Sequence, residues 1–225
     1  MRRGLFVLVS LVASSLLSFA QAPVPPQLGD DEASSAWTAV VSDEIRRAEY
    51  VYHPLTAEPA VVSAPNRSHE LRSRVSAAGL EVFPRATSAD GAGAEWKLTL
   101  RTTSFGRVSA DHGALALHEL GDARITTDAN RVELDHGLLT EWFVNDERGI
   151  EQGWTITERP RGVDPLWIGL DFGGDLSLRI DEGARSGVLV DVCGEAQLRY
   201  RDLVVFDATG RELEARIAPS PRRLT

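Results

Sequence analysis

From residue 50 onward, apolar and polar residues alternate in short runs, and this alternation constrains the fold more than any other feature of the chain. The runs 71–75, 96–100 and 132–134 are clear examples. A period of two places alternate side chains on one face of a β-strand. Further strands are predicted at 80–83, 115–117, 138–144, 154–156, 166–171, 175–180, 187–192, 196–200, 203–207 and 212–217.

Turn-forming residues separate these runs. Ala77-Ala78-Gly79 and His136-Gly137 predict early turns, and Cys193-Gly194 and Ala208-Thr209-Gly210 predict late hairpins. Short strands separated by glycine, aspartate and asparagine at roughly 8–12-residue intervals are typical of antiparallel sandwiches and barrels. The predicted fold is therefore mainly β, an antiparallel β-sandwich-like region with one N-terminal α-helix.

The helix is predicted over residues 34–48. Trp37, Val41, Ile45 and Ala48 recur at a spacing that lines one face of a helix. Acidic residues precede the segment and arginines lie near its end, an arrangement that suits the helix dipole.

The start of the chain has the three parts of a secretory signal. Two arginines lead into an apolar run over residues 5–17, which is within the length of an h-region. Cleavage is expected after Ala20 rather than Ala22, because the later cut would place Pro23 directly behind the scissile bond. A membrane anchor is the alternative, but it needs about 20 apolar residues, and serines interrupt this shorter run.

These features divide the chain into four parts. They are a signal peptide (1–20), an extended leader (21–33), a β-rich domain that includes the helix (34–217) and a disordered tail (218–225). The predicted location is secreted or in the cell envelope, with no membrane span after signal cleavage. Two prolines and adjacent arginines in the tail cannot continue a central strand. The strand that ends at Ile217 is therefore expected to be an unpaired edge, which suggests a truncated version of a longer protein.

Composition limits the partners and the source of stability. The net charge is −9, and removal of the signal takes away two arginines and no acid. Such a surface disfavours nucleic acid, whose phosphates require a basic face. Cys193 is the single cysteine, so no intrachain disulfide can form and the core must hold the fold. Cys193 is expected at an exposed hairpin tip.

Catalytic machinery is not evident in the sequence. It contains no Gly-x-Ser-x-Gly elbow, no phosphate-binding glycine loop and no zinc-binding histidine pair. Cys193 lacks the positive surroundings that activate a catalytic thiol. We therefore predict no catalytic residue, no cofactor and no metal site.

Two carboxylate pairs have alternative interpretations. Glu141 and Glu151 flank aromatic residues and could form a glycosidase pair, which needs carboxyl groups about 5–10 Å apart. The favoured interpretation is structural, with both acids fixing the turn between adjacent strands and Arg148 as a partner. Asp171 and Asp175 bracket two glycines and could bind Ca²⁺, but the EF-hand spacing is absent and the same residues suit a β-turn.

Several short stretches occur in an order known from one family. They are Asn66-Arg67, Leu71-Arg72, Pro84-Arg85, Trp96, Arg131-Val132-Glu133, 141–146, 148–155 and Leu198-Arg199-Tyr200. In this order they resemble the N-terminal β-rich region of secreted bacterial FG-GAP (integrin-α-like) repeat proteins. The most specific part is the Glu-Trp-x-x-Asn-x-x-x-Gly-x-Glu-Gln-Gly run, and the resemblance spans residues 36–217.

In that family the region precedes a β-propeller of calcium-binding repeats, which this sequence does not contain. The resemblance implies a cell-surface or extracellular location and a non-enzymatic binding or scaffolding role, but no function that resides in the propeller. The residues carried over are structural signature positions: Glu141, Trp142, Asn145, Gly149, Glu151, Gln152 and Gly153.

The sequence thus predicts a secreted or cell-surface structural or interaction module, with an unknown protein or a surface glycan as partner. The alternative is a carbohydrate-binding or carbohydrate-active extracellular protein, because β-sandwiches host many unrelated functions. Glycan binding needs exposed aromatic rings in a concave patch. Burial of Trp142 and Trp154 would remove the best candidates for it.

Overall fold

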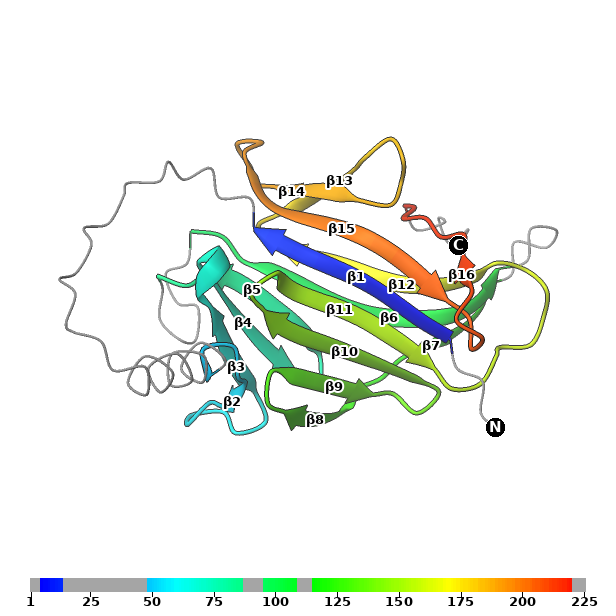
Figure 1. Ribbon diagram of the computed structural model, residues 1–225, viewed down its shortest axis with the longest axis horizontal. Coiled ribbons are helices and arrows are strands. Elements are labelled where there is room, and N and C mark those ends of the chain that lie inside the picture. Colours follow the sequence, from blue (N-terminus) through cyan, green and yellow to red (C-terminus); the bar gives the residue numbers. More distant parts are fainter. Residues whose placement is uncertain (1–4, 14–47, 87–94, 109–114, 220–225) are drawn as a thin grey trace, which may run out of the picture.

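A computed structural model describes residues 5–13, 48–86, 95–108 and 115–219 of the chain (Figure 1). These residues form two antiparallel β-sheets, which confirms the mainly β prediction. They include a 3-10 helix, η1 (Arg67–His69), and no helix among them could cross a membrane. The helix predicted over residues 34–48 has no support in the structure, because all of it except Ala48 lies outside the described residues.

The first sheet has nine strands in the order β13-β14-β15-β1-β11-β10-β9-β8, with β16 paired to β15. Their bounds are β1 (Leu5–Ala13), β8 (Arg124–Asp128), β9 (Arg131–Asp135), β10 (Leu139–Asp146), β11 (Gly149–Ile156), β13 (Ser177–Ile180), β14 (Gly187–Val190), β15 (Ala196–Phe206) and β16 (Glu212–Leu213).

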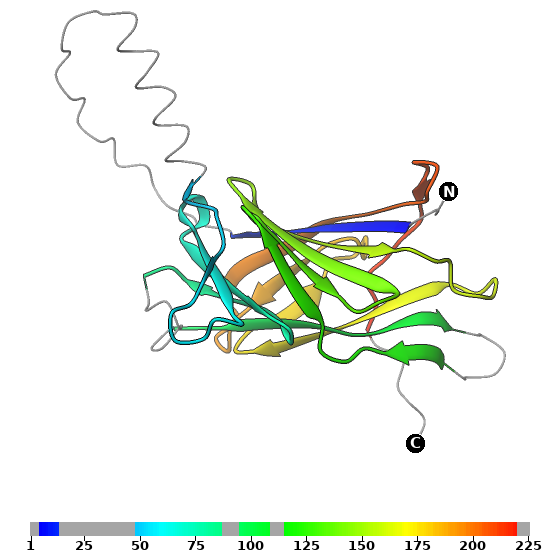
Figure 2. The same ribbon diagram turned by 90° about the horizontal axis from the view of Figure 1, so that it is seen from below.

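The second sheet has seven strands in the order β12-β6-β5-β4-β3-β2, with β7 paired to β6. Their bounds are β2 (His53–Pro54), β3 (Val62–Asn66), β4 (Leu71–Ser76), β5 (Gly79–Pro84), β6 (Leu98–Val108), β7 (Leu115–Glu119) and β12 (Leu166–Gly174). Seen from below, blue β1 and orange β15 lie above green β6 and yellow β12 (Figure 2). Both sheets supply one shared apolar core, whose fully buried side chains include Leu80, Leu98, Leu134, Phe143 and Ile150.

The β10–β11 hairpin shows how local sequence sets the register. The Asp146 carboxylate accepts a hydrogen bond from the Arg148 backbone N–H at 2.8 Å, and Gly149 has a φ of 132°, which a side chain would disfavour. The strands then pair without a break from Asp146↔Gly149 to Leu139↔Ile156. The odd-numbered residues of β10 and the even-numbered residues of β11 therefore face the core.

A buried amide pair ties the two sheets together. Asn145 of β10 and Asn66 of β3 are both fully buried, and Asn66 Nδ2 donates to Asn145 Oδ1 at 2.8 Å. Asn145 Nδ2 in turn donates to the carbonyl oxygens of Tyr50 (3.0 Å) and Pro65 (2.9 Å). The Asn145 amide is thus partnered on both its oxygen and its nitrogen, so the role of Asn145 in the structure is to join the two sheets.

Two late strand predictions need correction. The strands predicted at 196–200 and 203–207 are one strand, β15, which continues through Asp202 at a φ of 63°. A β-bulge there shifts the register with β1 and absorbs the break in alternation. The strand predicted at 212–217 contains only Glu212–Leu213, which pairs with β15, while the Ile217 N–H donates to the Ala184 carbonyl at 2.6 Å.

Both ends of the chain lie partly outside the described residues. The signal cleavage site, the leader 21–33 and residues 220–225 of the tail lie outside the described residues, so those predictions remain predictions. Strand β1, in contrast, falls within the predicted signal peptide and is described as part of the first sheet.

Replacing Asn145 with alanine is expected to lower the free energy of unfolding by about 3 kcal/mol, because it leaves several buried polar groups without partners. Urea unfolding measures the change. Thr140→Ala is the matched control, since Thr140 lies half-buried on the opposite face of the same strand. A loss for Asn145→Ala no larger than that of the control would contradict the bridging role.

Candidate functional site

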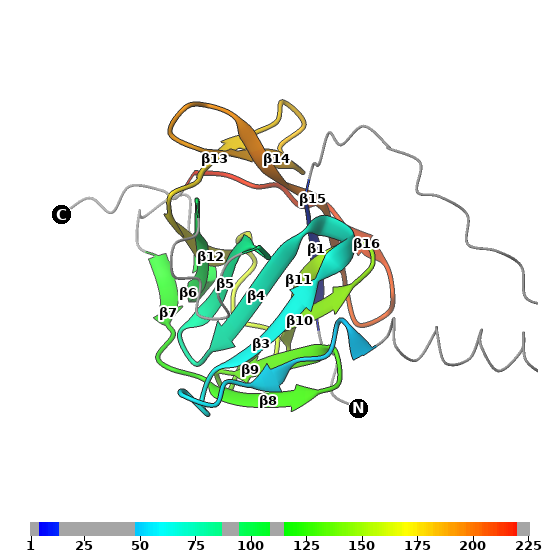
Figure 3. The same ribbon diagram turned by 90° about the vertical axis from the view of Figure 1, so that its left-hand side faces the viewer.

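Strand β12 lies at one end of the strand order of the second sheet. A cleft of about 900 Å³ is lined by residues of β12 and by residues of β11 and β15 of the first sheet. Figure 3 shows β12 on one side of the molecule and β11 and β15 on the other. Small-molecule sites usually have volumes of about 300–1,000 Å³. The apolar lining of the cleft includes Leu166, Ile168, Leu170, Phe172, Val205 and Ile217, all packed against the core yet only partly buried.

Aromatic rings form part of the cleft wall. Phe172 of β12 contacts Tyr200 of β15 edge-on, with ring centroids 5.5 Å apart and an interplanar angle of 89°. Trp154 of β11 also lines the cleft, and its Nε1 donates to Thr102 Oγ1 of β6 at 2.9 Å. These contacts join the two sheets, so the wall is fixed by both of them.

Arginines gather among the polar residues of the cleft. The cleft is lined by four arginines, Arg107, Arg159, Arg211 and Arg216, and by two acids, Asp207 and Glu214. Asp207 is already engaged, because its carboxylate accepts from Arg211 Nε at 3.3 Å. The cleft therefore has an excess of positive charge in a protein whose net charge is −9.

The surroundings of Arg107 disfavour its charged form. Burial lowers the pKa of Arg107, and the nearby charge of Arg159 lowers it further, while the charge of Asp164 raises it in part. Arg107 Nη1 donates to the Asp164 carbonyl, but its buried Nε has no hydrogen-bond partner. An anion between the two guanidinium groups would offset their repulsion and supply an acceptor.

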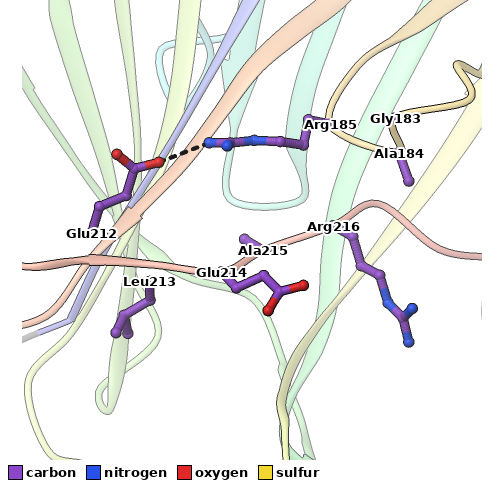
Figure 4. A pocket seen from close by; sticks show the side chains of 8 residues that line it. All are labelled: Gly183, Ala184, Arg185, Glu212, Leu213, Glu214, Ala215 and Arg216. Carbon is purple, nitrogen blue, oxygen red and sulfur yellow. Dashed lines mark hydrogen bonds and ion pairs between the residues drawn. The ribbon is translucent and has the colours of Figure 1, made fainter.

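A second, smaller hollow of about 570 Å³ adjoins the cleft (Figure 4). It lies between residues 183–185 and residues 212–216, and an ion pair crosses it from Arg185 Nη2 to Glu212 Oε1 at 3.0 Å. Residues 213–216 line both hollows and separate them. This segment therefore forms one border of the cleft.

Behind the cleft lies a buried polar network that crosses three strands. Glu141 of β10 is only 1% exposed, and its Oε1 accepts from Gln152 Nε2 of β11 at 2.6 Å. Gln152 Oε1 accepts from the Tyr200 hydroxyl of β15 at 2.9 Å. Burial raises the pKa of Glu141 to about 7, although hydrogen bonds from Gln152 and Thr102 lower it in part. Glu141 and Gln152 do not line the cleft, so the network supports its wall rather than its opening.

His136 lies against the same carboxyl group. Its Nε2 is 4.0 Å from Glu141 Oε2, and its Nδ1 lies 3.1 Å from the Gly121 carbonyl oxygen. Burial lowers the pKa of His136, which favours the neutral ring. With Nδ1 donating to Gly121, the buried and unpartnered Nε2 is an acceptor that faces a carboxyl group with a raised pKa.

The residues of the Glu-Trp run have separate structural roles. Glu141 and Gln152 meet in the buried network, and Asn145 and Gly149 act at the sheet junction and the turn. Trp142 lies on the outer face, where a Cβ on Gly153 would overlap its ring. Arg131 stacks on the same ring at 4.3 Å. Gly153 thus allows a close approach of the Trp142 ring to the backbone of β11.

Glu141 and Glu151 do not form a pair. Glu141 faces the core, whereas Glu151 lies on the outer face of the same sheet, where its Oε2 is 3.6 Å from Arg148 Nη2. The predicted partnership of Arg148 with Glu151 is confirmed. The prediction that Glu141 fixes the turn is wrong, because Glu141 reaches inward to Gln152. Carboxyl groups on opposite faces of one sheet cannot act on the same sugar, so the geometry does not support a glycosidase pair.

The carboxylates considered for Ca²⁺ binding, Asp171 and Asp175, and the single cysteine, Cys193, are all exposed. Asp175 accepts a hydrogen bond from the Lys97 backbone N–H at 2.9 Å, while Asp171 lies exposed within β12. No group of three or more potential metal-ligating side chains occurs in the described part of the chain. Cys193 is exposed between β14 and β15, which confirms the hairpin-tip prediction.

The tryptophans considered for glycan binding are buried. Trp142 is 7% exposed and Trp154 is 3% exposed, so neither presents a free ring face.

The sequence does not single out the cleft residues. The alternation in 166–171 predicts their strand, but it gives no sign that the inward face of this strand would remain partly uncovered.

Comparison of the chain with protein-family models, curated proteins and solved structures finds no match in any of the three.

The raised pKa of Glu141 predicts a dependence of stability on pH. Between pH 4.5 and about 7 the folded protein binds this proton more tightly than the unfolded chain does. The free energy of unfolding should therefore fall as pH rises through this window, by up to about 3 kcal/mol, and stay low above it. Urea unfolding at a series of pH values measures this slope.

Glu141→Gln should remove most of the slope, because an amide does not titrate. Burial also raises the pKa of Glu151, so only the difference between the wild-type protein and the variant reports on Glu141. Glu195→Gln, in the exposed β14–β15 turn, is the control and should keep the wild-type slope. An unchanged slope in Glu141→Gln would show that Glu141 is ionised in the folded protein throughout this range.

Proposed function

We propose that this protein is an exported, non-enzymatic binding module that holds an amphipathic ligand in the cleft between β12 and β15. The ligand class is an apolar chain that ends in an anionic group. The observation that carries the proposal is the row Leu166, Ile168 and Leu170, which packs against the core and still stays partly open to solvent. Covering apolar surface of this kind is the main favourable term in binding.

The arginines support the anionic end. Arg107 and Arg159 lie close enough for their charges to oppose each other, and Arg107 has an unpartnered buried Nε. Carboxylate and phosphate groups match the planar donor geometry of arginine. A sugar would instead require many converging polar groups, which the apolar wall of β12 does not supply.

Export rests on the predicted signal peptide over residues 1–20, and the acidic sequence disfavours nucleic acid as a partner. A relationship to the N-terminal region of FG-GAP repeat proteins is part of the same proposal. The buried roles of Glu141, Asn145 and Gln152 are what structural signature positions would require. A glycan ligand is the alternative, and its best stacking surface is now Trp167, which is half-buried and lines the cleft.

Ligand binding can be tested with a fatty acid whose conjugated polyene absorbs tryptophan emission, because Trp154 and Trp167 line the cleft. Saturable energy transfer is expected at one ligand per protein. Leu170→Gln should weaken binding at least about tenfold, equivalent to about 1.4 kcal/mol. Asp171→Gln, at the neighbouring exposed position of β12, should leave binding unchanged.

The anionic end is tested by comparing the fatty acid with the alcohol of the same chain. Arg159→Gln should weaken binding of the acid and leave binding of the alcohol unchanged, whereas Arg201→Gln, exposed on β15, should affect neither. An equal loss for both ligands would remove the charge argument. Absence of saturable transfer, with a soluble oligosaccharide binding instead, would favour the glycan alternative.

A further inference from the structure

Strand β1 occupies an interior position of the first sheet, between β11 and β15 (Figure 1). It runs antiparallel to both neighbours, with register pairs from Leu5↔Ile156 to Leu11↔Ile150 on one side and from Phe6↔Phe206 to Ala13↔Leu198 on the other. Without it, β11 and β15 would be neighbours that run parallel to each other.

The same residues are the apolar part of the predicted signal peptide. Cleavage after Ala20 would remove all of β1 from the exported protein. The backbone N–H and C=O groups that β11 and β15 direct at β1 would then lose their partners in the middle of the sheet. Unpaired groups along two facing strands form a template for another strand.

Contacts between side chains outside β1 keep β11 and β15 far enough apart for a strand to lie between them. The Tyr200 hydroxyl of β15 donates to Gln152 Oε1 of β11 at 2.9 Å, and this bond spans the place of β1. Neighbouring strands lie about 4.8 Å apart, so β11 and β15 must remain roughly two such spacings apart to flank a strand. Direct pairing of β11 with β15 would require one of them to shift by a full spacing.

Both ends of this bridge are fixed by further contacts. Gln152 also donates to Glu141 on β10, and Tyr200 packs edge-on against Phe172 of the other sheet. Trp154 lies two residues along β11 from Gln152, and its Nε1 donates a hydrogen bond to Thr102 Oγ1 of the second sheet at 2.9 Å. A shift of β11 or β15 would break these buried contacts, so the gap is set by the core and not by β1 alone.

We propose that in the exported protein the gap between β11 and β15, here called the strand slot, accepts an extended apolar segment of a partner polypeptide. The segment adds as a strand antiparallel to both neighbours. The proposal rests on the export part of the proposed function and does not require a ligand in the cleft.

The slot defines the chemistry of its occupant. The core-facing residues beside it are mainly apolar, namely Ile150, Trp154 and Ile156 on β11 and Leu198, Leu203 and Val205 on β15. The sequence in the slot, Leu-Phe-Val-Leu-Val-Ser-Leu-Val-Ala, carries no charge over nine residues. A partner segment must therefore be uncharged on its core-facing positions and free of proline at its centre, because both of its edges pair with strands.

The first measurement is the N-terminus of the full chain after export from a bacterial host, determined by mass spectrometry. A start at Gln21 is expected. That exported protein is then titrated with a fluorescent peptide of the β1 sequence, extended with lysines for solubility. We expect saturable one-to-one binding, a higher melting temperature and slower amide exchange in β11 and β15.

Two variant peptides test pairing within the sheet. Val9→Pro removes a central N–H at the position paired with Gln152, and should weaken binding at least about tenfold. Leu5→Pro places proline at the first residue of the strand, where it is tolerated, and should change binding far less. Equal binding of both peptides would indicate non-specific apolar contact and overturn the proposal.

Other outcomes also decide the question. Retention of Met1 would show that β1 is a permanent strand, and both cleavage and the slot would be ruled out. A processed protein with protected β11 and β15 amides and no peptide binding would show a closed sheet, which overturns the slot and leaves export intact. A processed dimer in light scattering would show that a second copy fills the slot, which overturns a separate partner. Fatty-acid transfer, measured on the same sample, reports separately on the cleft.

Discussion

The buried chain from Glu141 through Gln152 to Tyr200 is the interaction on which the rest of the molecule depends. It links β10, β11 and β15 and spans the place of β1. In a low-dielectric interior such hydrogen bonds are strong, and a group left without its partner is costly. An apolar core of the same shape would avoid that cost, so a buried acid here is best explained by the strand spacing and register it fixes.

Much of the fold is predictable because local chemistry and tertiary context agree. The β10–β11 hairpin has both clear alternation and a turn that Asp146 and Gly149 stabilise. Strand β3 escapes prediction because Val62–Asn66 contains Pro65 and lacks alternation, and its backbone is held by pairing with β4. The bulge at Asp202 resembles a chain reversal in the sequence because it interrupts the period of two, although the strand continues past it.

The candidate site is harder to predict for a physical reason. A period of two shows which residues share a face, but whether that face is covered depends on the opposite sheet. Leu166, Ile168 and Leu170 alternate along β12 as residues of any core-facing strand do, so their partial exposure leaves no trace in the sequence. For Glu141, the place in the hairpin can be predicted from the sequence, but the buried network cannot. Tyr200, at the far end of that network, lies in a distant part of the chain.

The cleft and the strand slot share their walls, so the two proposed binding events must be coupled. Trp154 on β11 and Val205 on β15 line the cleft, and the same two strands flank β1. The core sets the separation of these walls, and a strand in the slot would add main-chain pairing along both of them, which reduces the ordering that a cleft ligand must impose. By linkage, a ligand in the cleft would favour the strand by the same factor. The Tyr200–Gln152 bond belongs to both sites, since Tyr200 lines the cleft and the bond spans the slot.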